Sequence, residues 1–348
     1  MEARRGEVAG IDSASVTQWF RENIEGAEPP LRFEIIPGGH SNLTYRVGDR
    51  AGNVFVLRRP PLGAVVATAH DMAREHRIIA ALGPTPVPVP PALGLCEDNG
   101  VNDAPFYVMR FVEGSVLVNA GDVERDFPGP ERDRIGESVI DVLADLHCVD
   151  PDAVGLGDLG RREAYLQRQL RRWRTQWEKT RTRELPLMDE VHQALGQHCP
   201  PQNGAAIVHG DYRLGNAITG ADGRIAAVLD WELCTLGDPL ADLGYLLNNW
   251  AAQGEVGPTT RGAALSPSMA GGFPDRAQMV ERYARRTGAE VRNVAFYRAF
   301  QYWRLGAIVE GVMSRYLKGV MAGEADTDSM RLQVEELAVA ARSMIEEL

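Results

Sequence analysis

The sequence predicts an α+β fold with two lobes, a β-rich N-terminal lobe and a mostly helical C-terminal lobe. The chain has 348 residues, about twice the size of a usual single domain. Short alternating apolar runs of strand length are concentrated in the first part of the chain, and a helical period dominates the rest. We therefore expect the lobes to span residues 1–112 and 113–348.

The expected N-terminal lobe is a sheet with a long helix. Residues 12–26 predict a short preceding helix with Ser13 as its candidate cap, and residues 65–82 predict the main helix. The proline-rich run at 84–91 is interpreted as a stiff connector, in preference to a docking motif. Strands are expected at residues 33–36, 43–47, 54–57, 92–96 and 105–109.

The expected C-terminal lobe is helical except for one hairpin. That hairpin covers residues 206–230 and turns at 221–223. Residues 253–274 are rich in Gly, Ala, Ser and Pro and are expected to form a long surface loop. Helices are predicted at residues 131–148, 161–181, 185–198, 239–252, 275–287, 291–318 and 327–347.

Composition excludes several classes of protein. A net charge of −11 argues against nucleic acid as a partner, because such proteins usually carry a basic face. No apolar run is long enough to cross a bilayer, and the N-terminus has no apolar segment typical of a secretory signal. The four cysteines are far apart and form no C-x-x-C pair, which argues against a structural zinc site. Their spacing is typical of a protein in the reducing cytoplasm.

The most informative segment is Val-His-Gly-Asp-Tyr-Arg-Leu-Gly-Asn at 208–216, followed by Val-Leu-Asp-Trp-Glu at 228–232. Asp211 follows a short apolar strand and is a candidate general base for a hydroxyl group. Asn216 and Asp230 supply oxygen ligands of the kind that Mg²⁺ prefers. Either aspartate alone could simply cap a turn, whereas the full set matches what phosphoryl transfer needs. We interpret His209 as a buried support of the loop.

A second group of residues is suited to binding phosphates. Gly38 and Gly39 would let the backbone approach a phosphate closely, and Ser41 and Asn42 add hydrogen-bond donors.

Arg58 lies in the strand predicted at 54–57 or just after it, and its cation is expected to bind the α- and β-phosphates. Glu75 on the next predicted helix is the carboxylate expected to hold Arg58 in place. The alternative is that Arg58 and Glu75 are solvated surface charges. Asp238 and Asp242 are interpreted as structural supports near a helix start.

These motifs resemble the aminoglycoside phosphotransferase family, a branch of the protein-kinase-like fold. The resemblance rests on His-Gly-Asp-Tyr-Arg-Leu-Gly-Asn, on Leu-Asp-Trp-Glu and on Gly-Asp-Pro-Leu-Ala-Asp-Leu, and it is strongest to kinase-like domains fused to acyl-CoA dehydrogenases. It implies a bilobal nucleotide-dependent O-phosphotransferase in which Asp211 is the base and Asn216 and Asp230 hold Mg²⁺. Residues 38–42 would cover the phosphates of ATP or GTP.

The resemblance also implies that the linker 109–112, through Met109 and Phe111, offers backbone groups to the purine. The sequence departs from protein kinases in having Arg58 where they usually have lysine, and Asp-Trp-Glu in place of Asp-Phe-Gly. No activation segment follows that motif, which argues against protein substrates.

The acceptor is expected to be a small molecule with a hydroxyl group, either aminoglycoside-like or a hydroxyacyl or hydroxy-acid compound. The predicted helix at 161–181 is rich in arginine, which suits an anionic acceptor. The preferred interpretation of the pattern is nevertheless a solvated helix face whose aromatic side chains pack inward. No membrane, nucleic-acid or protein partner is implied. The alternatives to an active small-molecule kinase are a catalytically silent kinase-like module that binds nucleotide and, less well supported, a protein kinase.

Overall fold

The computed structural model describes residues 8–37, 42–63, 71–258, 266–320 and 325–348, and it divides into two compact units. The first unit contains residues 1–114 together with 226–233. The second contains residues 115–225 and 234–348. The first unit is therefore built from two separate stretches of the chain.

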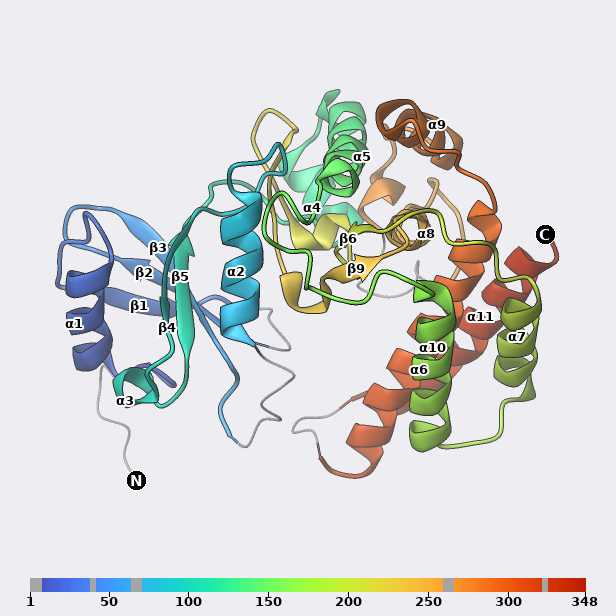
Figure 1. Ribbon diagram of the computed structural model, residues 1–348, viewed down its shortest axis with the longest axis horizontal. Coiled ribbons are helices and arrows are strands. Elements are labelled where there is room, and N and C mark those ends of the chain that lie inside the picture. Colours follow the sequence, from blue (N-terminus) through green and yellow to red (C-terminus); the bar gives the residue numbers. More distant parts are fainter. Residues whose placement is uncertain (1–7, 38–41, 64–70, 259–265, 321–324) are drawn as a thin grey trace. The chain divides into compact units, whose positions relative to one another are not determined.

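The first unit contains an antiparallel sheet of five strands in the order β1-β2-β3-β5-β4 (Figure 1). The five predicted strands are confirmed to within two residues. Their bounds are β1 Arg32–Ile35, β2 Leu43–Gly48, β3 Val54–Arg59, β4 Ala92–Cys96 and β5 Phe106–Arg110.

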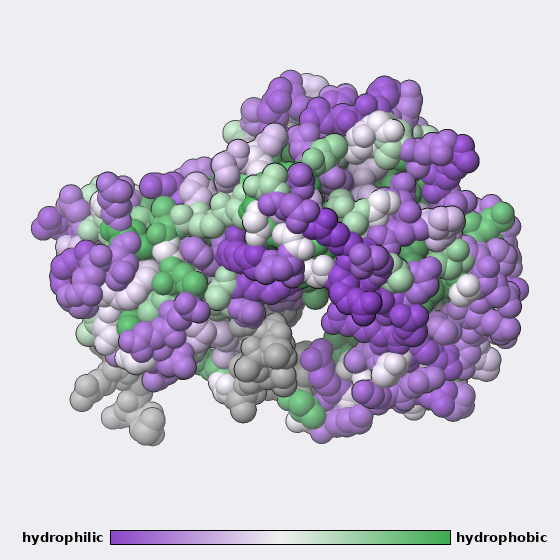
Figure 2. Space-filling model, viewed as in Figure 1, coloured by the Kyte–Doolittle hydropathy of each residue, from purple (hydrophilic) through white to green (hydrophobic). Residues whose placement is uncertain are grey.

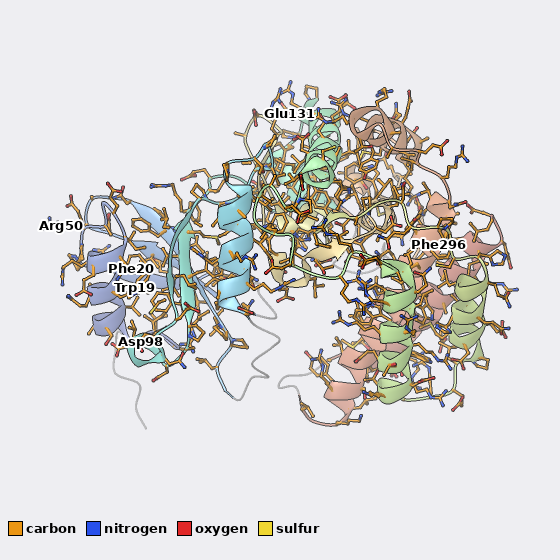
Figure 3. All side chains as sticks on the ribbon, in the orientation of Figure 1. Trp19, Phe20, Arg50, Asp98, Glu131 and Phe296 are labelled. Atoms are coloured by element: carbon orange, nitrogen blue, oxygen red, sulfur yellow. The ribbon has the colours of Figure 1, made fainter. Side chains whose placement is uncertain are left out.

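Two helices cover opposite faces of this sheet because strand side chains alternate between the faces. Phe55 and Leu57 of β3 and Phe106 of β5 join the core that α1 (Ser13–Asn23) completes. Trp19 of α1 packs edge-on to Phe106 with ring centroids 4.9 Å apart, and Figure 3 shows Trp19 at this core. The next side chain after Leu57, Arg58, points to the face covered by α2 (Met72–Leu82).

The helix caps correct one sequence prediction. The cap of α1 is Asp12 and not Ser13, because the Asp12 carboxylate accepts the N–H groups of Ala14 and Ser15. The described part of the main helix begins at Met72, capped by Asp71, and the predicted residues 65–70 lie outside the described residues. A short helix, α3 (Asn99–Asn102), was not predicted.

The second unit is helical, and its longest helix, α10, packs against α6, α7, α8 and α11. Figure 1 shows α10 and α11 side by side. All seven predicted helices are present, and among the described α-helices of this unit α4 alone was not predicted. The helices are α4 Ala120–Asp126, α5 Glu131–Cys148, α6 Tyr165–Thr180, α7 Pro186–Gln197, α8 Leu240–Asn248, α9 Arg276–Thr287, α10 Val294–Leu317 and α11 Thr327–Ile345.

The hairpin predicted at residues 206–230 is replaced by two separate sheets of two strands each. The strand before Asp211, β6 (Ala206–Val208), pairs with the unpredicted β9 (Thr235–Gly237), whereas β7 (Ala217–Thr219) pairs with β8 (Ile225–Val228). Two 3₁₀ turns, η1 (Leu214–Asn216) and η2 (Trp231–Leu233), follow β6 and β8.

The predicted loop at 253–274 is not wholly superficial. It contains a further 3₁₀ turn, η4 (Pro267–Ala270), in which Ser268 is buried and donates to the Ala251 carbonyl. Within the described ranges, the helices lack the combination of length and apolar character that a bilayer span requires.

Candidate functional site

The turn after β6 is held in place by one buried carboxylate. The N–H of His209 donates to Asp242 Oδ2 at 2.6 Å, and the N–H of Gly210 donates to Asp242 Oδ1 at 2.9 Å. Gly210 has φ +86°, a left-handed conformation that glycine adopts without steric cost. The fully buried His209 accepts the Asp211 N–H at its Nδ1 (3.2 Å). The predicted supporting roles of His209 and Asp242 are therefore present in the structure.

Asp242 is an ionised acceptor inside the second unit. Burial by itself would raise the pKa of this carboxyl, but the hydrogen bond and charge of His147 and the N–H of Gly210 outweigh burial and lower the pKa. His147 Nε2 lies 3.5 Å from Asp242 Oδ2, and its Nδ1 lies 2.7 Å from the Tyr283 hydroxyl. The turn therefore rests on a fixed negative charge.

Asp211 and Asn216 form one geometric unit. Asn216 Nδ2 donates to Asp211 Oδ2 at 2.7 Å and to the Asp211 carbonyl at 2.8 Å. The two Asp211 oxygens can only accept hydrogen bonds, so the end of the Asn216 amide that faces them must be the nitrogen. The amide oxygen of Asn216 accepts nothing from the described residues, so it is available to a cation. This donor set fits the magnesium ligand expected at position 216.

A cation that the sequence prediction did not use lies beside Asp211. Arg213 Nε is 3.6 Å from Asp211 Oδ1, and about a third of the Arg213 side chain is exposed. The motif displays this arginine two positions after Asp211, but nothing in the sequence says that its side chain turns back toward the carboxylate.

In the first unit, Arg58 joins two carboxylates. Its Nε lies 3.2 Å from Glu75 Oε2, and its Nη2 donates to Asp230 Oδ1 at 2.5 Å. The side chains of Arg58 and Glu75 are only 13% and 3% exposed, so they are not solvated surface charges. Burial would lower the pKa of Arg58, but Tyr107, Glu75 and Asp230 together raise it.

Glu75 is held from two further directions. Asn42 Nδ2 donates to Glu75 Oε1, and the Tyr107 hydroxyl donates to Glu75 Oε2, each at 3.0 Å. Burial raises the pKa of Glu75 above its usual value, against the opposing effects of Arg58 and Tyr107. Tyr107 was not predicted, because a tyrosine in a strand pattern looks like any other core residue.

Asp230 follows β8 and has φ +66°, a conformation that aspartate tolerates better than most residues. One of its oxygens binds Arg58, while the other, Oδ2, accepts no hydrogen bond from the described part of the chain. A carboxylate with one committed and one open oxygen fits the expected metal ligand. Mg²⁺ is commonly held by one or two protein ligands plus substrate phosphates.

Not all of the predicted nucleotide-binding residues can be placed. Gly38, Gly39 and Ser41 lie outside the described residues. Met109 is in β5, paired with Val56 of β3 and Ala92 of β4. Phe111 follows that strand and its N–H donates to the Val54 carbonyl at 3.3 Å. The structure thus assembles Arg58, Glu75 and Asp230 in the first unit and, separately, Asp211 and Asn216 in the second.

The arginine-rich helix α6 has two kinds of face. Its buried residues include Trp177, as expected for aromatic side chains that pack inward. Arg174 is paired with Glu178 and Asp189. Arg171 and Arg172 form no ion pair with any residue that the structure describes, and Figure 2 shows a strongly hydrophilic surface over α6.

Comparison with known proteins identifies relatives over most of the chain. The family model described as "Phosphotransferase enzyme family" matches residues 32–296. The chain is 35% identical to mouse acyl-CoA dehydrogenase family member 10 over 310 residues, which is 87% of this chain and 28% of the relative. It is 32% identical to chicken acyl-CoA dehydrogenase family member 11, over 84% of this chain and 38% of that protein. The chain thus spans well under half the length of these relatives.

Solved structures agree with this result. A candidate aminoglycoside phosphotransferase from Ralstonia eutropha JMP134 is 35% identical, with a TM-score of 0.81 and coverage of 97% of this chain and 98% of the other. The aminoglycoside phosphotransferase APH(2″)-IIIa, solved with GDP and kanamycin, is 14% identical with a TM-score of 0.62, covering 94% of this chain and 98% of that one, and it shares the fold alone. The predicted α+β, protein-kinase-like fold is confirmed.

Proposed function

The chain belongs to the phosphotransferase enzyme family, and we propose that it is an ATP- or GTP-dependent small-molecule kinase that transfers the γ-phosphoryl group to a hydroxyl in the presence of Mg²⁺. The observation that carries the proposal is the pair formed by Asp211 and Asn216. One amide fixes the orientation of the candidate base with its nitrogen and keeps its oxygen open for a cation. A module that only binds nucleotide could use the amide oxygen for a cation, but it would not need the amide nitrogen to orient a base.

Each residue then has a defined task. Asp211 accepts the proton of the acceptor hydroxyl as the oxygen attacks phosphorus, and Arg213 offsets negative charge beside it. Asn216 and Asp230 hold Mg²⁺, which neutralises phosphate charge when bound.

On the nucleotide side, Arg58, oriented by Glu75, binds phosphate oxygens, and residues 38–42, including Gly38, Gly39, Ser41 and Asn42, cover the phosphates. The purine contacts backbone groups of the segment from Met109 to Phe111. Because the Phe111 N–H is already donated to Val54, carbonyl groups of this segment are the better candidates.

For the acceptor, we favour an anionic compound such as a hydroxyacyl-CoA or hydroxy acid over an aminoglycoside-like cation. Arg171 and Arg172 on α6 are cations without a described carboxylate partner, and they would attract an anion and repel a polycation. The names of the relatives, acyl-CoA dehydrogenase family members, are consistent with an acyl-CoA. Equilibrium binding of a hydroxyacyl-CoA and of kanamycin should be compared. Tighter binding of kanamycin would refute the anionic acceptor.

The main alternative is a catalytically silent nucleotide-binding module. Turnover separates the two, measured as Mg²⁺-dependent phosphate release from ATP and GTP with and without candidate acceptors. Asp211→Asn should abolish turnover while nucleotide binding persists. Absence of turnover in the wild type, together with retained nucleotide binding, would favour the silent module. We further propose a cytoplasmic location, which the four free cysteines support.

A further inference from the structure

A buried guanidinium lies behind the turn that carries Asp211. Arg304 of α10 is only 7% exposed. Its Nη2 donates to the Gly210 carbonyl at 3.0 Å, and its Nη1 donates to Gln301 Oε1 at 2.9 Å. The guanidinium carbon lies 5.3 Å from the ring centroid of Trp173 on α6 and 5.9 Å from that of Tyr245 on α8. One side chain thus connects three helices to the residue before the candidate base.

Among the described residues, no carboxylate lies within ion-pair distance of this cation. Arg304 forms no ion pair within the described ranges, and its Nε is buried without a hydrogen-bond partner there. Burying an unpaired charge is unfavourable in general, whereas a neutral side chain could donate to one carbonyl without that penalty. The cation–π contacts with Trp173 and Tyr245 offset only part of that penalty. Stability alone therefore does not account for an arginine at this position.

The geometry around Gly210 suggests what the arginine does. The peptide groups of this residue are held from both sides, with the N–H on the Asp242 carboxylate and the carbonyl on the Arg304 guanidinium. Tyr245, whose ring centroid lies 5.9 Å from that guanidinium carbon, also interacts with the Asp211 side chain. Burial and the Asp211 charge raise the pKa of the Tyr245 phenol, so its hydroxyl remains a donor. Arg304 can therefore influence the position of the Asp211 carboxylate in two ways, through the Gly210 carbonyl and through Tyr245.

We propose that Arg304 is a positioning residue for phosphoryl transfer, which orients Asp211 through the Gly210 carbonyl and through Tyr245. The inference rests on the proposed kinase function. Its role differs from that of Asp211 because it acts through other residues and need not contact the nucleotide or the acceptor.

The test compares Arg304→Met with a matched control on the same helix. Arg298→Met also removes a guanidinium that binds α8, since Arg298 Nε donates to Asn248 Oδ1 at 3.0 Å, but it does not contact the turn. We expect Arg304→Met to lower kcat by on the order of 10²-fold, as misplacement of a reacting group by about 1 Å can do. The KM for nucleotide should stay within about two-fold, which identifies an effect on the chemical step. Arg304→Lys should recover part of kcat, and Arg298→Met should leave kcat unchanged.

Hydrogen exchange of the segment 206–214 gives a readout that does not depend on activity. The His209 and Gly210 amides should exchange faster in Arg304→Met and at the wild-type rate in Arg298→Met. Equal losses of kcat in the two variants, or unchanged kcat and exchange in Arg304→Met, would overturn the proposal. If the wild type itself shows no turnover, the kinase function fails and exchange alone decides whether Arg304 holds the turn. If Arg304→Met does not fold, Arg304→Lys and Tyr245→Phe provide the comparison, and wild-type kcat in both would overturn it.

Discussion

Replacing Arg58 by methionine should destabilise the nucleotide-free protein far more than the loss of an ordinary surface arginine. The Arg58 guanidinium is the cationic partner of Glu75, whose side chain is 3% exposed, and of Asp230, which is 30% exposed. Removing one member of a buried ion pair typically costs about 3–5 kcal/mol, because the remaining charge is left uncompensated. The more exposed Asp230 should add less than about 1 kcal/mol, since water screens it.

Protonation of Glu75 limits this cost, so we expect a loss of about 3 kcal/mol at neutral pH, the lower end of the range. The loss should depend on pH in a defined direction. Burial already raises the pKa of Glu75, and without Arg58 the pKa must rise further. The folded state then retains a proton that the unfolded state releases, so the stability of Arg58→Met should fall as the pH rises.

The assay is urea denaturation without nucleotide and in the presence of EDTA, between pH 5 and pH 8, a range around neutrality in which an unperturbed glutamate is ionised. Arg50→Met is the matched control. Arg50 pairs with Glu28 at 3.2 Å, with side chains 70% and 53% exposed, and its loss should cost less than about 1 kcal/mol. Figure 3 labels Arg50 at the periphery of the first unit.

In the double variant Arg58→Met, Glu75→Gln, most of the lost stability should return, because the buried carboxylate is gone and the remaining unpaired carboxylate, Asp230, is partly exposed to water. If Arg58→Met is as stable as Arg50→Met, or if Glu75→Gln fails to restore stability, the reasoning about the buried pair is refuted.

Three further predictions concern the second unit. Asn216→Ala should raise the Mg²⁺ concentration that gives half-maximal turnover, and it should lower kcat, because the variant loses both an oxygen ligand and the donor to Asp211. An unchanged Mg²⁺ dependence would contradict the role of Asn216. Gly244→Ala should destabilise the protein by about 1–3 kcal/mol in thermal unfolding, since a methyl group there would lie 2.8 Å from the backbone of Tyr297. An unchanged melting temperature would show that α8 and α10 can move apart to accept the methyl group. Asp242→Asn should lower stability by on the order of 3 kcal/mol, since two N–H groups lose an ionised acceptor. Because the folded-state pKa of Asp242 is lowered, this difference should be complete above pH 3.8 and shrink as the pH falls further, and acid titrations of both proteins should converge.

The parts of the fold that the sequence predicted are those with enough residues to show a period. Helix α5 was predicted at its observed bounds, whereas α3, which has 4 residues, and β9, which has 3, are too short to produce a pattern. The pairing of β6 with β9 was missed for the same reason. Ser13 was predicted as the cap of α1 and the structure has the adjacent Asp12, because only the local geometry decides between neighbouring polar residues.

The candidate site was predictable where its residues share a motif. Asp211 and Asn216 are five positions apart, and their contact follows from a tight turn. Arg304 and Gly210 are 94 positions apart, and their contact depends on how α10 packs, which local patterns do not specify. Tyr107 was equally hidden, because strand alternation predicts that it is buried but not that its hydroxyl meets Glu75.

The discontinuity of the first unit limits how this protein can be divided. Residues 226–233 carry Asp230 and are inserted in the sequence of the second unit, so a fragment ending at residue 114 would lack the carboxylate that Arg58 binds. It would also lack the N–H of Val228, which donates to the Pro88 carbonyl. A cut between the units would thus separate Arg58 from one of its two counter-charges. Gene fusion, domain transplantation and split-protein designs should therefore treat the two units as one inseparable segment.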